Sequence, residues 1–139
     1  MWLFSYLLMA IFHIPEPLPP EGCVVPVDDI HASFALFGWL PVGSSHNSIS
    51  PRLVLHPTQL EVKIMRTDYY GYKGISQVDY LPSRLFRSAQ VVLKLAESGT
   101  QFFLYLSSAT VEKSVLSFLQ AQGIALSAAA QLALATSRN

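Results

Sequence analysis

Residues 89–123, AQVVLKLAESGTQFFLYLSSATVEKSVLSFLQAQG, decide the fold of this chain. Apolar and polar side chains alternate on both sides of Ser98-Gly99, which is the pattern of half-buried antiparallel strands. The Ser-Gly pair indicates a hairpin turn, because glycine tolerates the positive φ that such turns require. The first part of the stretch therefore predicts two paired strands.

A helix is predicted directly after the second strand. Thr110 is the expected N-cap, Glu112 lies near the positive end of the helix dipole, and Gly123 ends the helix. An apolar stripe at helical spacing would close one end of the sheet. The alanine-rich residues 127–136 have high helix propensity but are too short to be stable alone, so they must dock on another surface.

The rest of the chain adds strands and turns but no helix between them. We expect a first strand at 32–42, a polar loop at 43–50, and further strands at 52–56, 60–64, 69–75 and 78–80. The prediction is a mainly β fold with a C-terminal helix, in which a bent antiparallel sheet or barrel is capped by that helix.

The N-terminal residues 2–14, WLFSYLLMAIFHI, are almost continuously apolar, and four prolines follow within residues 15–20. A bilayer-spanning helix needs about 20 apolar residues, so this segment is too short to cross a membrane. It would pack on its own domain, dip into a membrane surface, or dock on another subunit. The candidate contact residues are Trp2, Phe4, Leu7, Leu8 and Phe12.

The composition indicates a protein that binds a partner or a membrane. The chain is 51% hydrophobic and only 13% charged, against about 25% charged residues in typical domains. Residues 1–51 contain no Lys or Arg, and all nine basic residues follow from Arg52 onward. The basic residues form no cluster of three, so we expect no nucleic-acid binding. The single cysteine, Cys23, fits a reducing compartment.

No catalytic or metal-binding constellation is apparent in the sequence. The four histidines lie far apart without metal-ligand spacing, and no nucleophile elbow occurs. We therefore expect no enzymatic activity, no metal and no cofactor.

The order of these elements resembles a pleckstrin-homology-like (PH-like) domain, in particular the small bacterial PH-like group and the related GRAM type. The residues that carry the resemblance are Leu53-Val54-Leu55, Gln59-Leu60-Glu61-Val62, residues 72–78, Val91-Val92-Leu93-Lys94-Leu95, Ser98-Gly99, residues 102–106 and the helix from Thr110.

The resemblance covers about residues 50–123. It implies a PH-like domain at 31–123, flanked by an apolar N-terminal segment and linker at 1–30 and a C-terminal tail at 124–139. Phosphoinositide-binding members use Lys and Arg on the first two strands. Residues 32–51 contain neither, so we expect no phosphoinositide site.

Aromatic and cationic residues cluster in the middle of the chain, as at many protein interfaces. These interaction candidates are Arg66, Tyr69, Tyr70, Tyr72, Lys73, Arg84, Phe86 and Arg87. The competing interpretation is an aromatic strand packed in the sheet with solvated charges at its ends.

The sequence thus predicts a non-catalytic binding or scaffolding module. It would be an accessory subunit of a larger protein complex, in the cytoplasm, with peripheral attachment to a membrane as an open possibility. The alternative is a carrier that holds a small apolar ligand or lipid inside the barrel. An apolar cavity would favour the carrier, and a filled interior would favour the subunit.

Overall fold

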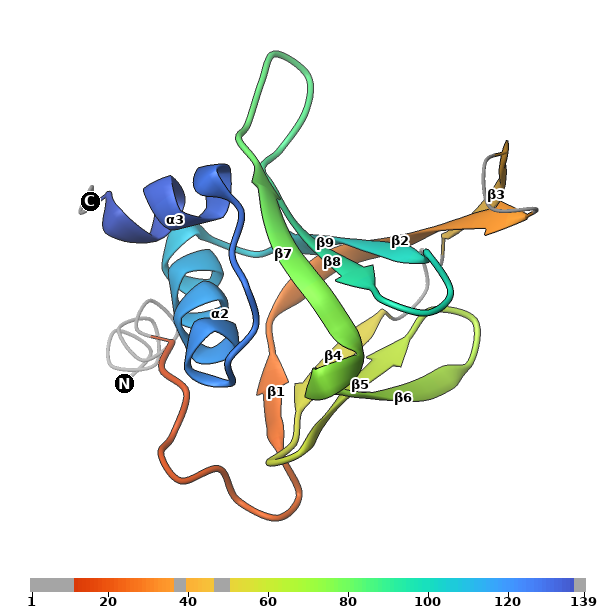
Figure 1. Ribbon diagram of the computed structural model, residues 1–139. Helices are drawn as coiled ribbons and strands as arrows, with labels where there is room; N and C mark the ends of the chain where they lie inside the picture. The colour runs from red at the N-terminus through yellow and green to blue at the C-terminus, as the bar shows by residue number, and fades with distance from the viewer. Residues whose placement is uncertain (1–11, 37–39, 47–50, 137–139) are drawn as a thin grey trace, which may run out of the picture.

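The computed structural model describes residues 12–36, 40–46 and 51–136, whose strands form two antiparallel sheets (Figure 1). One sheet has the order β1-β4-β5-β6, with β1 Cys23–Val25, β4 Arg52–Leu55, β5 Gln59–Lys63 and β6 Thr67–Gly71. The other has the order β3-β2-β9-β8-β7, with β2 Val27–Leu36, β3 Leu40–His46, β7 Ile75–Leu81, β8 Gln90–Leu95 and β9 Gln101–Leu106.

The predicted mainly β fold with a bent antiparallel sheet and a C-terminal helix is confirmed. Among the described residues, the two sheets keep separate strand orders and do not close into a barrel. The assignment to the PH-like family stays a prediction.

A bend at Pro26 carries the chain from the first sheet to the second. β1 pairs with β4 and β2 pairs with β9, and Pro26 lies between them without an N–H to offer either ladder. Its carbonyl oxygen instead accepts hydrogen bonds from the backbone N–H and the hydroxyl of Ser107, both at 3.2 Å. Residues 23–30, which the sequence placed in a linker, therefore form β1 and the start of β2.

The core lies between the two sheets and is filled with aliphatic side chains. β5 and β9 bury every second residue, as their alternation predicts. Fully buried leucines come from both sheets, among them Leu53, Leu60, Leu93 and Leu104.

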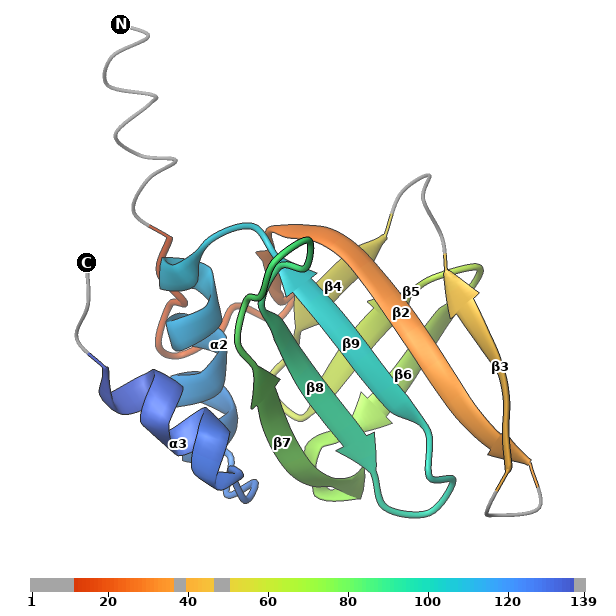
Figure 2. The same ribbon diagram turned by 90° about the horizontal axis from the view of Figure 1, so that it is seen from above.

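Helix α2 (Ala109–Ala121) lies at one end of the two sheets (Figure 2). Val115, Leu116 and Leu119 are buried in the core, as the stripe predicts. The N-cap is Ser108 and not Thr110, because the Ser108 hydroxyl accepts a hydrogen bond from the Val111 N–H at 3.3 Å.

The C-terminal segment packs on its own domain. The Val78 N–H donates to the Ala125 carbonyl and the Ser127 N–H donates to the Val78 carbonyl, both at 2.9 Å, so residues 124–127 run along the outer edge of β7. Helix α3 (Ala128–Ala135) then packs against β7 and α2, with Ala130 fully buried. The tail predicted to leave apolar surface for a partner is therefore largely used internally, although Leu132 stays exposed.

Two predicted strand boundaries were wrong. Residues 32–42 do not form one strand, because β2 ends at Leu36 and pairs with β3 as a hairpin, and β3 includes residues 43–46 of the predicted loop. Residues 69–75 are interrupted by the short 3-10 helix η1 (Tyr72–Gly74), which leads from the first sheet into the second. The Tyr72 side chain points inward from this short helix, and its hydroxyl donates a hydrogen bond to the His56 carbonyl at 2.7 Å.

Candidate functional site: a groove on α2 and a projecting tip

The predicted aromatic cluster is divided by the fold. Tyr72 is buried, and its ring packs edge-on against Phe118 of α2 with the ring centroids 5.6 Å apart. Burial raises the pKa of the Tyr72 phenol well above its usual range. Tyr70 is half-buried and packs against Phe102 at 5.3 Å between centroids. Both tyrosines contribute to packing, in agreement with the packed-strand interpretation, and present little surface to a partner.

The remaining members of the first cluster lie at the surface. Tyr69 and Lys73 are exposed, and the Arg66 guanidinium Nε lies 3.2 Å from the Asp68 carboxylate. An ion pair this exposed contributes little to stability. The structure does not bring these three residues together with Arg84, Phe86 and Arg87 into one described contact.

Arg84, Phe86 and Arg87 lie on a hairpin turn that projects from the body between β7 and β8 (Figure 1). The backbone N–H of Arg84 donates to the Arg87 carbonyl at 2.8 Å, and the Arg87 N–H donates to the Arg84 carbonyl at 2.9 Å. Leu85 and Phe86 occupy the two central positions. We call residues 84–87 the 84–87 tip.

The 84–87 tip exposes two large apolar side chains. Leu85 is 82% exposed and Phe86 is 97% exposed. Phe86 has φ of +67°, in the left-handed region that disfavours bulky residues. Phe86 is one of the interaction candidates predicted from the sequence, and Leu85 is not. The signal was available, because the two residues stand together between arginines in a stretch with turn residues on both sides.

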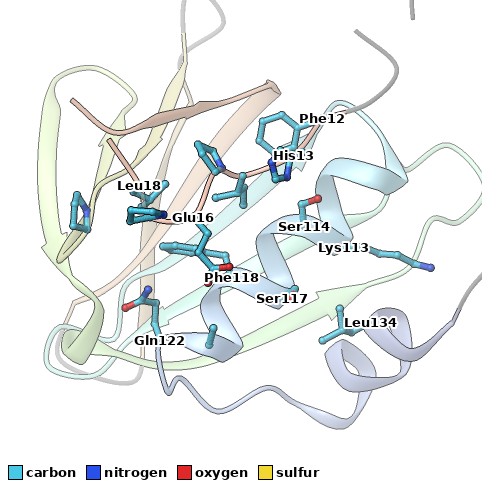
Figure 3. A pocket seen from close by; sticks show the side chains of 15 residues that line it. Phe12, His13, Glu16, Leu18, Lys113, Ser114, Ser117, Phe118, Gln122 and Leu134 are labelled. Carbon is cyan, nitrogen blue, oxygen red and sulfur yellow. The ribbon is translucent and has the colours of Figure 1, made fainter. Parts of the chain in front are cut away.

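A groove of about 710 Å³ lies between residues 12–18 and α2 (Figure 3). Its apolar lining includes Phe12, Ile14, Leu18, Phe118 and Leu134. Its polar lining includes His13, Glu16, Lys113, Ser114, Ser117 and Gln122. In Figure 3, the side chains from the N-terminal segment form one wall and those of α2 form the wall that faces it. Local sequence patterns do not predict this groove, because its two walls are about 100 residues apart along the chain.

The end of the apolar N-terminal run lies in this groove. Phe12 and Ile14 are partly buried against the core of their own domain, and they also line the groove. Trp2, Phe4, Leu7 and Leu8 lie outside the described residues, and their role in attachment stays a prediction.

A smaller hollow of about 340 Å³ lies between the two sheets at the β5–β6 turn. Val62, Tyr70 and Phe102 form part of its apolar lining, and Arg66 and Asp68 lie at the same place. A carrier would need such a hollow to hold its ligand. The volume of this one is at the low end of the range for ligand pockets.

The polar groups near the core form separate pairs. His56 Nε2 lies 2.8 Å from Glu61 Oε1, and the Tyr80 hydroxyl donates to Glu112 Oε1 at 2.9 Å. Burial raises the pKa of Glu112 and, together with that carboxylate, raises the pKa of Tyr80 to about 12. Burial also raises the pKa of the Cys23 thiol, which leaves it protonated and a poor nucleophile. Within residues 12–136 as described, no group of three or more His, Cys, Asp or Glu side chains could hold a metal ion.

Comparison with known proteins adds no relative: no family model and no curated protein matches the chain. No helix in the described part of the chain is long and apolar enough to cross a bilayer.

Proposed function

We propose that this chain is a non-catalytic binding module, an accessory scaffolding subunit that holds an apolar segment of a partner protein in the groove on α2. The groove carries the proposal. Its lining combines apolar side chains, among them Phe12, Leu18 and Phe118, with polar ones, a mixture that is typical of protein interfaces.

The shape and charge of the groove favour a protein segment as its occupant. An amphipathic helix or extended segment places apolar anchors along such a groove at regular spacing. The lining carries charges of both signs, from Glu16 of the N-terminal segment and Lys113 of α2, and Figure 3 shows Lys113 extending outward from the helix. Two opposite charges at different places along the groove would favour one direction of a bound segment.

The polar chemistry of the described residues supports binding over catalysis. The His56–Glu61 pair has Arg52 Nε 3.9 Å from Glu61 Oε2, and neither this pair nor the Tyr80–Glu112 pair lines either of the two described cavities. We place the subunit in the cytoplasm, at the periphery of a membrane-associated assembly.

The carrier alternative has one observation in its favour, the hollow between the sheets. Elsewhere, the positions between the sheets are occupied by fully buried side chains such as Leu53, Leu93 and Leu104. Binding of a fluorescent fatty acid, measured by titration, distinguishes a carrier from a scaffold. Saturable binding that Val62→Trp abolishes would favour the carrier, and no binding would favour the scaffold.

The groove is tested with two substitutions on the same helix. Ser117 is exposed and lines the groove, whereas Gln120 is exposed on α2 but lies outside it. We expect Ser117→Arg to fill the groove and to abolish stoichiometric co-purification of a partner from native cells. Gln120→Arg, the matched control, should retain the partner.

The proposal fails if both variants retain the same partner, or if the unmodified chain purifies from native cells as a monomer with nothing bound. Circular dichroism of both variants would establish that α2 is intact.

A further inference from the structure

The 84–87 tip is a fixed structure that presents two apolar side chains to solvent. The reciprocal backbone hydrogen bonds between Arg84 and Arg87 hold the turn closed. Leu85 and Phe86 therefore project from a defined hairpin and have almost no contact with their own domain. A bulky residue at positive φ is strained, and such strain is concentrated at functional positions.

The charge around the tip is positive. The loop between β7 and β8, residues 82–89, contains Arg84 and Arg87 but no acidic residue. Among the described residues, neither arginine of the tip pairs with a carboxylate, and Arg87 Nη2 makes a long hydrogen bond of 3.4 Å to the Pro82 carbonyl. Both guanidinium groups can therefore bind phosphate oxygens, for which their planar fork of donors is well suited.

The shape of the tip decides which partner suits it. A stable protein interface buries about 1,200–2,000 Å² in total, and a convex turn with two apolar side chains supplies only a small part of that. A bilayer needs no complementary pocket. Its hydrocarbon lies just below its phosphates, which matches an apolar apex with a cation on each side.

We propose that the 84–87 tip inserts into the surface of an anionic lipid bilayer. Leu85 and Phe86 enter the acyl region, and Arg84 and Arg87 bind headgroup phosphates. Two apolar side chains give marginal membrane affinity, so the binding is reversible and weakens as salt screens the arginines. This lipid contact goes beyond the groove and does not depend on it.

Sedimentation with vesicles tests the proposal in the full chain. We expect the protein to bind vesicles made of equal parts phosphatidylcholine and phosphatidylglycerol more tightly than vesicles of phosphatidylcholine alone. The double substitution Leu85→Ser with Phe86→Ser should weaken binding by at least about tenfold. Met65→Ser, the matched control, removes another exposed apolar side chain outside the tip and should leave binding unchanged.

A second readout reports insertion at the tip itself. Tryptophan emission added by Phe86→Trp should shift to the blue on anionic vesicles, and emission added by Met65→Trp should not. The proposal is overturned if the tip double variant binds vesicles as the unmodified chain does, or if neither vesicle binds. It is also overturned if tip substitutions release a co-purified protein without changing vesicle binding. Ser117→Arg should bind vesicles normally, which separates this result from a failure of the groove.

Discussion

Replacing Phe86 with glycine should make the protein more stable. Phe86 has φ of +67°, and left-handed backbone costs a residue with a Cβ about 1–2 kcal/mol. Because the side chain is 97% exposed, its removal sacrifices little packing. Glycine offsets about 0.5–1 kcal/mol of this gain, because it makes the unfolded chain more flexible and so raises the entropy cost of folding. The net expectation for Phe86→Gly is a gain of about 0.5–1 kcal/mol.

Urea unfolding followed by circular dichroism measures this gain. The midpoint should rise with an unchanged m-value, and the Tm should increase by about 2–4 °C. Phe86→Ala is the matched control, because it removes the ring and keeps the strained φ. Its stability should stay within about 0.5 kcal/mol of the unmodified chain.

The opposite result would refute the reasoning. A Phe86→Gly variant less stable than Phe86→Ala would mean that the residue at position 86 does not hold a strained φ in solution. If the reasoning holds, Phe86→Gly gains stability while it loses vesicle binding, so the two properties are opposed at a single residue.

Further predictions concern the backbone, the buried carboxyl group and the helix cap. Gly22→Ala should destabilise the fold more than Gly99→Ala. Both glycines have positive φ, but a Cβ at Gly22 would lie 2.7 Å from a buried valine methyl whereas one at Gly99 meets open space. Urea unfolding should give a net loss of about 0.5–1 kcal/mol for Gly99→Ala and at least about 1 kcal/mol more for Gly22→Ala. Burial raises the pKa of Glu112, so the folded state binds its proton more tightly than the unfolded state. Stability should therefore fall as pH rises above the unfolded value of about 4.3, and Glu112→Gln should remove that part of the slope in unfolding curves measured across pH. Tyr80, with its pKa raised to about 12, should cause a further loss of stability between pH 10 and 12, which alkaline titration of unfolding would detect. Ser108→Ala should cost about 1 kcal/mol in thermal unfolding through loss of the α2 cap.

The parts of the fold that depend on residues close together in the sequence were predicted from local patterns. The β8–β9 hairpin follows from Gly99, whose φ is +73°, and α2 follows from its apolar stripe. The cap was misplaced by two residues because Ser108 and Thr110 are both good capping residues, and only the packed helix chooses between them.

Other parts depended on contacts between distant residues. β3 includes a polar run that resembles a loop, and pairing with β2 makes it a strand. The sequence pattern left Tyr72 either at an interface or packed in the sheet, and its hydrogen bond to the His56 carbonyl, 16 residues away, accompanies its burial in the core. The exposure of Leu85 follows from the projection of the hairpin away from the body, although its position beside Phe86 between two arginines is visible in the sequence.

Strand β7, at the outer edge of the second sheet, is covered by residues 124–127. At its centre, both backbone groups of Val78 are bonded to residues of the segment 124–127. A chain cut after Gly123 would leave those groups unpaired on a strand rich in apolar side chains. Such an edge recruits a strand from another molecule. Residues 124–127 therefore cover this edge, and a chain that lacks them should self-associate as its concentration rises.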